Sequence, residues 1–300
     1  MPLALDPIAP LILRTDAIAL RVSPFSRTSH VVTWLSPEHG RVATVVKGAC
    51  RPKSAFLGQY DICTTCELLF YRHEHESVHA IRECSPLTPR HALRDDWRRI
   101  TTASYLCDLV ARVAQPGQES AEIFHLLEST LDQLCTQPAA PDLILRFELN
   151  LLNHLGLLPH LEGCPECHTT EHPWLRFALA AGHICCRHTH ATAANEPAVT
   201  VHRDVLAHLH NLATAEPTSH PDLAAAKLPH PSAAPHRTGA HATPHRLPPA
   251  LPPHLSLGSR RFLGIFIRFH LDTPAAPRRL AFELLETCPA SFGIPKGDRQ

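Results

Sequence analysis

The chain has 300 residues, of which 44% are hydrophobic and 19% charged, a composition typical of a soluble globular protein with one or two domains. It excludes a fully disordered chain and a coiled coil. Basic and acidic residues balance at 28 each, so the net charge gives no global sign of a nucleic-acid or membrane partner. The sequence shows no run of 18 apolar residues and no export signal, so we expect a cytoplasmic protein without a membrane partner.

Residues 10–86 are expected to form strands. Short runs rich in β-branched and aromatic residues alternate there with turn-forming segments, and no clear helical pattern interrupts them. Five such strands in one short region predict a small closed or partly closed barrel. The expected strands are Leu11–Val22, His30–Leu35, Gly40–Val46, Tyr60–Tyr71 and Ser77–Cys84.

From Arg90 the hydrophobic period changes to that of helices, which predicts a helical domain over residues 87–160. Asp142 follows Pro141 and is expected to cap one of its helices. Residues 199–214 and 258–290 are expected to continue this domain. The helices are expected at about 90–113, Ile123–Leu134, Asp142–Leu155, Thr200–Leu212, Ser259–Leu271 and Arg278–Glu286.

Between the last two parts, residues 215–257 are rich in proline, alanine and histidine. A segment of this composition buries too little apolar surface to offset the entropy lost on ordering. We therefore expect residues 215–257 to be a disordered insertion within the helical domain.

Residues 161–198 carry the strongest chemical signal. Cys164 and Cys167 form a Cys-x2-Cys pair that can present two thiolates to one tetrahedral ion, and Cys185 and His188 repeat the spacing. These four residues predict a structural zinc site, with Cys186 or His190 as replacement ligands. Four protein ligands leave no open position for water, which argues against a hydrolase. The alternative is that Cys185 and Cys186 are core residues and that Cys164 and Cys167 are a reduced pair of thiols.

A second Cys-x2-Cys pair, Cys63 and Cys66, lies in a predicted strand, where residues three apart point to opposite faces. The pair also has no partner pair nearby. We therefore interpret both cysteines as core residues.

Basic residues concentrate in residues 10–60, which contain seven arginines and lysines but only two acidic residues, a net charge of +5. Their densest part, Lys47–Ser54, is predicted to be a loop that could follow a phosphate chain. Phe25, Phe56 and Tyr60 could offer stacking faces there, whereas Trp34 is expected in the core. The alternative is a solvated charged face. The residues predicted to contact nucleic acid are Arg14, Arg27, Arg41, Lys47, Arg51 and Lys53.

Short motifs occur in both the barrel and the helical regions. They are Ser26–Thr33, Glu38–Arg41, Lys47–Ala49, Lys53–Ser54, Ala103–Leu106, Arg146–Leu149, Leu155–Pro159 and Arg260–Leu263. Together these segments resemble the RecO family of recombination and DNA repair proteins, and the resemblance covers about residues 10–214 and 258–287. His188 departs from it, because many members have a fourth cysteine there, and so does the Pro/Ala/His-rich insertion.

This resemblance implies an α+β protein, with an N-terminal OB-fold β-barrel followed by an α-helical domain that holds an inserted zinc site. It implies a non-enzymatic role at the nucleoid: binding single- and double-stranded DNA, annealing complementary single strands and assisting recombinase loading. The implied partners are RecR, RecF in some members, and single-stranded DNA-binding protein.

Two other functions compete with this one. A zinc-containing OB-fold protein could bind RNA, because the fold serves both nucleic acids. A zinc-dependent hydrolase would need an open metal position and a glutamate base, for which His73–Glu76 is the nearest candidate. The sequence contains no P-loop, nucleophile elbow or dinucleotide fingerprint, so we expect no enzymatic activity.

Overall fold

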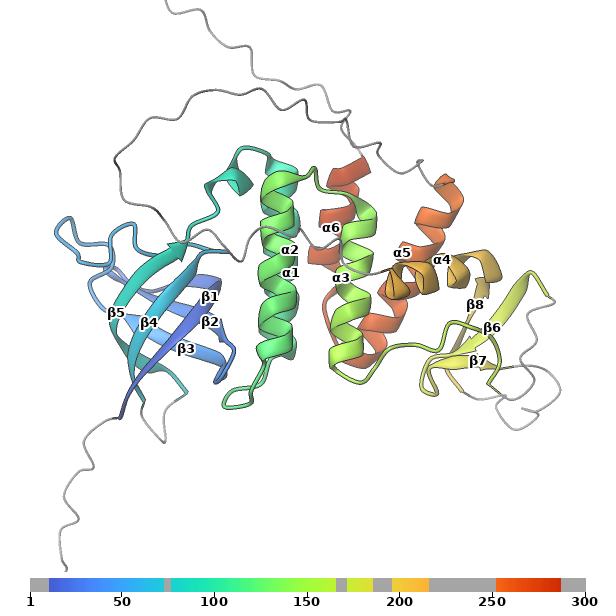
Figure 1. Cartoon of the computed structure of the whole chain (residues 1–300), viewed down its shortest axis with the longest axis horizontal. Coiled ribbons are helices and arrows are strands. Elements are labelled where there is room, and N and C mark those ends of the chain that lie inside the picture. Colours follow the sequence, from blue (N-terminus) through green and yellow to red (C-terminus); the bar gives the residue numbers. More distant parts are fainter. Residues whose placement is uncertain (1–10, 73–76, 166–171, 186–195, 216–251, 287–300) are drawn as a thin grey trace, which may run out of the picture.

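The computed structural model of the protein describes residues 11–72, 77–165, 172–185, 196–215 and 252–286. A five-stranded barrel, a layer of helices and a small sheet follow one another along the long axis of the molecule (Figure 1). No helix in these ranges is both long enough and apolar enough to cross a membrane. The barrel strands are β1 (Leu11–Ser26), β2 (Ser29–Ser36), β3 (Gly40–Val46), β4 (Thr65–Arg72) and β5 (His79–Thr88).

The barrel closes in the order β1-β2-β3-β5-β4. The long strand β1 closes it, because its first half pairs with β4 and its second half with β2. Neighbours pair antiparallel except β3 and β5, which pair in parallel. This arrangement is that of an OB-fold, as predicted. The barrel extends to Thr88, two residues past the predicted boundary, and β4 begins at Thr65 rather than at Tyr60.

Alternating burial along the strands explains the barrel core. In β3 every second residue is buried, starting with Gly40 and ending with Val46, as expected for a strand with one inward face. Trp34 is fully buried, and its indole N–H donates to the Thr44 hydroxyl at 2.9 Å, so the prediction that Trp34 is a core residue is confirmed.

The helical layer follows a short 3-10 helix, η1 (His91–Arg94). The helices bury one apolar face each in a shared core that also includes Leu20 and Leu35 of the barrel. The α+β class with an N-terminal barrel followed by helices is therefore confirmed. The helices are α1 (Trp97–Val113), α2 (Ala121–Thr136), α3 (Pro141–His154), α4 (Arg203–Thr214), α5 (Pro253–Leu271) and α6 (Ala275–Glu286).

Several helices begin at residues other than those predicted, and two of them begin with a proline. Helix α3 begins at Pro141 and Ala140 is its N-cap, so Asp142 lies inside the first turn, where its charge faces the positive end of the helix. Helix α5 begins at Pro253, so the last residues of the predicted disordered insertion are helical. Proline suits both first turns because its fixed φ is helical and its missing N–H needs no partner there. Residues 216–251, the rest of that insertion, lie outside the described residues.

A three-stranded antiparallel sheet of order β7-β6-β8 stands at the far end of the molecule from the barrel (Figure 1). Its strands are β6 (Trp174–Ala178), β7 (His183–Cys185) and β8 (Ala198–His202). The helix predicted to begin at Thr200 begins only at Arg203, because residues 198–202 pair with β6 instead. The three consecutive β-branched residues Val199–Val201 suit a strand once a partner strand exists.

The barrel and the helices are joined at the β2–β3 turn. Gly40 has a φ of 63°, and a Cβ there would lie 2.2 Å from the Gln115 carbonyl oxygen, so no side chain fits. The Arg41 N–H donates to that same oxygen at 3.1 Å, and the Gly117 N–H donates to the His39 carbonyl at 2.9 Å. The turn is thus hydrogen-bonded to the α1–α2 connection.

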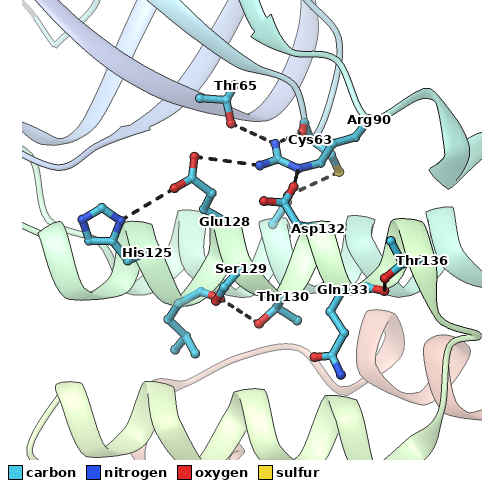
Figure 2. A network of polar contacts seen from close by, with 12 residues as sticks. Cys63, Thr65, Arg90, His125, Glu128, Ser129, Thr130, Asp132, Gln133 and Thr136 are labelled. Carbon is cyan, nitrogen blue, oxygen red and sulfur yellow. Dashed lines mark hydrogen bonds and ion pairs between the residues drawn. The ribbon is translucent and has the colours of Figure 1, made fainter. Parts of the chain in front are cut away.

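Arg90 forms a second connection between the barrel and the helices. Its guanidinium is almost fully buried between the barrel and helix α2 (Figure 2). It donates to the Cys63 carbonyl at 2.9 Å and to the Thr65 hydroxyl at 2.8 Å on the barrel side. On the α2 side it pairs with Asp132 at 2.6 Å and with Glu128 at 3.9 Å. One buried cation therefore ties together three segments.

A second buried polar network connects helices α1, α3 and α6. Glu148 of α3 is fully buried and forms a two-point ion pair with Arg278 of α6, with N–O distances of 2.7 and 2.8 Å. The Tyr105 hydroxyl of α1 donates to the same carboxylate at 2.5 Å. Burial opposes the charged form of Arg278, but the Glu148 carboxylate raises its pKa above the usual value. This pair fixes α6 against α1 and α3.

Candidate nucleic-acid interface

The β1–β2 turn and the loop after β3 meet at one end of the barrel, opposite the β2–β3 turn; the loop after β3 projects at upper left in Figure 1. We call residues 47–54 of this loop the cationic loop. Two contacts hold it against the β1–β2 turn: the Cys50 N–H donates to the Thr28 carbonyl at 3.2 Å, and the Gly48 N–H to the Ser29 hydroxyl at 3.2 Å. Gly48 has a φ of 72°, a conformation that glycine adopts without strain.

Four of the six predicted contact residues gather at this end. Arg27 lies at the tip of the β1–β2 turn, and Lys47, Arg51 and Lys53 lie in the cationic loop. All four side chains are exposed, and none has an ion-pair partner within the described part of the chain. Exposed cations without internal partners remain available for an external anion such as a phosphate.

Arg14 and Arg41 are not brought to this end. Arg14 lies where β1 pairs with β4, and its Nε donates to the Glu67 carboxylate at 2.9 Å. Arg41 follows the opposite β2–β3 turn, and its guanidinium donates to the Ala111 carbonyl of α1 at 3.0 Å. The six predicted contact residues therefore do not all lie at one end of the barrel.

Phe25 is the exposed aromatic residue nearest to these cations in the sequence, with 66% of its surface accessible. It sits in a β-bulge: Pro24 pairs with His30 and Ser26 with Ser29, which leaves Phe25 without a residue opposite. A bulge redirects the side chain of its extra residue away from the regular alternation. Phe25 can therefore offer a ring face to a base, while Phe56 and Tyr60 are half-buried against the barrel core.

The expectation that Cys63 and Cys66 are core residues is confirmed, although Cys63 precedes the strand rather than lying in it. Both are buried, and they belong to different cores: Cys66 faces the barrel interior and Cys63 the helical layer. The Cys63 sulfur lies 3.6 Å from that of Cys107 on α1.

Of the predicted zinc ligands, Cys164 and Cys185 are described. Cys164 is fully buried and Cys185, at the end of β7, is half-buried. Burial raises the pKa of the Cys185 thiol, Glu196 and Cys164 add to this rise, and Arg176 opposes it. Within the described ranges, no three His, Cys, Asp or Glu side chains come together as a metal site would need. Cys167 and His188, the replacement ligands Cys186 and His190, and the His73–Glu76 segment all lie outside the described residues.

The sequence analysis did not predict a chain of polar contacts between Cys50, His30 and Tyr60 in this interface. The Cys50 sulfur lies 3.3 Å from Nε2 of His30, and Nδ1 of His30 lies 2.8 Å from the Tyr60 hydroxyl. Only the position of Cys50 among cations could have drawn attention to it. His30 comes from β2 and Tyr60 from the loop before β4, so their approach depends on barrel closure.

Comparison with known proteins matches two consecutive parts of the chain to the models of one family. Residues 11–90 match the family model described as recombination protein O N terminal, and residues 94–227 match recombination protein O C terminal. Three relatives are each named DNA repair protein RecO. That of Alkaliphilus metalliredigens is 29% identical, over 60% of this chain and 73% of its own length. That of Moorella thermoacetica is 31% identical, over 59% of this chain and 66% of its own. That of Myxococcus xanthus is 28% identical, over 62% of this chain and 76% of its own. With both of its domains matched, the chain belongs to the RecO family.

Proposed function

We propose that this protein acts in DNA repair and homologous recombination, where it binds DNA, anneals complementary single strands and assists recombinase loading. The observation that carries the proposal is the group of four exposed cations at one end of an OB-fold barrel. The names of the relatives, DNA repair protein RecO, support the same role. By family resemblance its partners are RecR, RecF in some members, and single-stranded DNA-binding protein.

Strand annealing in the presence and absence of Mg-ATP tests this function. Complementary labelled oligonucleotides should anneal faster with the protein, and equally fast with or without Mg-ATP, because the sequence contains no P-loop. An RNA oligonucleotide of the same sequence should compete more weakly than DNA. Preferential binding of the RNA would support the RNA-binding alternative instead.

Phe25→Ala should weaken binding of single-stranded DNA by about tenfold, because base–aromatic stacking contributes roughly 1–3 kcal/mol per base. Binding of duplex DNA should change little, since paired bases are already stacked within the helix. Titration of the protein with single-stranded and duplex oligonucleotides measures both affinities.

Leu57→Ala is the matched control for this experiment. Leu57 lies in the β3–β4 connection that contains the cationic loop and is about as exposed as Phe25, but it has no π-face. Phe25→Trp should retain the affinity for single strands. An equal loss from Phe25→Ala and Leu57→Ala would show a general apolar contact rather than stacking.

We further propose a structural zinc ion held by Cys164, Cys167, Cys185 and His188. The sequence supports it, because thiolate and imidazole are the donors that structural zinc prefers and both pairs have the Cys-x2-Cys or Cys-x2-His spacing. Such an ion would tie the end of β7 to the segment after α3. It would leave no open position for a reacting water.

Elemental analysis of freshly purified protein should find about one zinc per chain. Cys164→Ser should abolish zinc binding and unfold the segment around the small sheet, because this segment gains its order from the ion. Cys135→Ser, which changes a cysteine on α2, should keep the zinc. Protein purified without chelators and free of zinc would contradict the proposal.

A further inference from the structure

The cysteines differ sharply in their surroundings. Of those in the described ranges, Cys50 is the exposed one, whereas Cys63, Cys66, Cys84, Cys107 and Cys164 are buried and Cys135 and Cys185 half-buried. A hydrogen bond with Cys63 and burial raise the pKa of the Cys107 thiol, and a hydrogen bond with Cys84 and burial raise that of Cys66. Buried thiols of this kind are chemically inert.

Cys50, in contrast, has the arrangement of an activated nucleophile. Its sulfur lies 3.3 Å from Nε2 of His30, a distance suited to proton transfer between thiol and imidazole. The other ring nitrogen, Nδ1, lies 2.8 Å from the Tyr60 hydroxyl. Burial raises the pKa of Tyr60 to about 12, with smaller electrostatic contributions from Cys50, Cys84 and Asp61. The Tyr60 hydroxyl therefore stays protonated and neutral. A neutral hydroxyl can accept the Nδ1 hydrogen, which leaves Nε2 free to take the thiol proton.

Cys50 lies among the cations that we propose for DNA binding. Cys50 lies between Lys47 and Arg51, in the cationic loop, and its N–H fixes that loop to the β1–β2 turn. Cations attract small anionic reagents and raise their local concentration. Any negatively charged group attached to Cys50 would lie among the cations that we propose for DNA binding.

We propose that Cys50 is a modification site, which forms a mixed disulfide with a small anionic thiol such as glutathione and thereby weakens DNA binding. The first part rests on the Cys50–His30–Tyr60 geometry, and the second rests on the proposed function. The redox state of the small-thiol pool would then set how strongly this surface holds single strands.

The reaction is a thiol–disulfide exchange. His30 takes the proton of the Cys50 thiol, and the sulfur attacks one sulfur of oxidised glutathione. The disulfide bond of glutathione breaks as the bond to Cys50 forms, and the leaving glutathione thiolate takes the proton. One disulfide and one thiol enter and leave, so no further oxidant is needed. The attached glutathione has two carboxylates and one ammonium group, a net charge of −1.

The rate of adduct formation at Cys50 tests the site without DNA. Full-length protein is treated with oxidised glutathione at fixed pH, and the adduct is quantified by mass spectrometry of the peptide containing Cys50. The intact protein should react about tenfold or more faster than a synthetic peptide of residues 47–54, which keeps the cations but lacks His30. His30→Gln and Tyr60→Phe should both slow the reaction. Equal rates in protein and peptide would overturn the proposed site.

The affinity for single-stranded DNA tests the consequence. The adduct should lower affinity roughly eightfold at 0.05 M salt for each phosphate that the protein no longer neutralises, and dithiothreitol should restore it. Cys50→Ser treated in the same way should keep its affinity. An adduct that leaves affinity unchanged, while Arg51→Ala with Lys53→Ala lowers it, would overturn the regulatory role. If that double variant also binds normally, the proposed DNA surface is wrong, and the rate measurement still decides the modification site.

Discussion

Arg51→Ala combined with Lys53→Ala should weaken binding of single-stranded DNA about 60-fold at 0.05 M salt. Each phosphate neutralised on a single strand contributes about 0.7 to the slope of log affinity against log salt. The four exposed cations at the end of the barrel, Arg27, Lys47, Arg51 and Lys53, therefore predict a slope of about −2.8 for the native protein. The double variant should have a slope of about −1.4 and should anneal strands more slowly.

Arg14→Ala combined with Arg21→Ala removes the same charge elsewhere on the barrel. Arg14 pairs with Glu67 and Arg21 with Asp108, so neither is free to meet a phosphate. This control should retain the native slope. Both double variants should keep the fold, since exposed cations contribute little to stability. If Arg51→Ala with Lys53→Ala left the slope unchanged, the cations would be only a solvated face.

Glu148→Gln should lower the free energy of unfolding by about 3–5 kcal/mol, because it leaves the buried Arg278 cation without its counter-charge. Three features make this position sensitive: the carboxylate is fully buried, Arg278 contacts it at two points, and the Tyr105 hydroxyl donates to it. Urea denaturation followed by circular dichroism measures the change.

Glu67→Gln provides the matched control, since it removes the same charge from the exposed ion pair with Arg14. It should cost about 0–1 kcal/mol. Glu148→Leu combined with Arg278→Met should recover much of the stability, because apolar residues can replace a buried ion pair. A cost below about 1 kcal/mol for Glu148→Gln would show that the pair does not hold α6 in place.

The local pattern of residues was sufficient to predict most elements. The run of β-branched residues in Gly40–Val46 predicted a strand, and these are the bounds that β3 has. The helical period over Asp142–Leu155 predicted the helix that became α3. Element boundaries were less accurate wherever a contact distant in sequence decided them, as at Thr200, where pairing with β6 replaces the first turn of the expected helix.

The candidate interface was predictable only in part. The sequence indicated a basic region and its densest loop, because charge and turn residues are local properties. It could not separate Arg27, Lys47, Arg51 and Lys53, which have no ion-pair partner in the described part of the chain, from Arg14 and Arg41, whose partners lie 53 and 70 residues away. It also could not show that His30 and Tyr60 meet Cys50, or that Glu148 is buried against Arg278.

The barrel, the helices and the charge of the N-terminal region could be predicted because they depend on hydrophobic period and composition within a few residues. The fold was needed to show which cations have no ion-pair partner within the described residues and which side chains form the Cys50–His30–Tyr60 chain. Both properties depend on neighbours in space. Closure of the barrel by β1 and its attachment to α1 and α2 bring those neighbours together from distant parts of the chain.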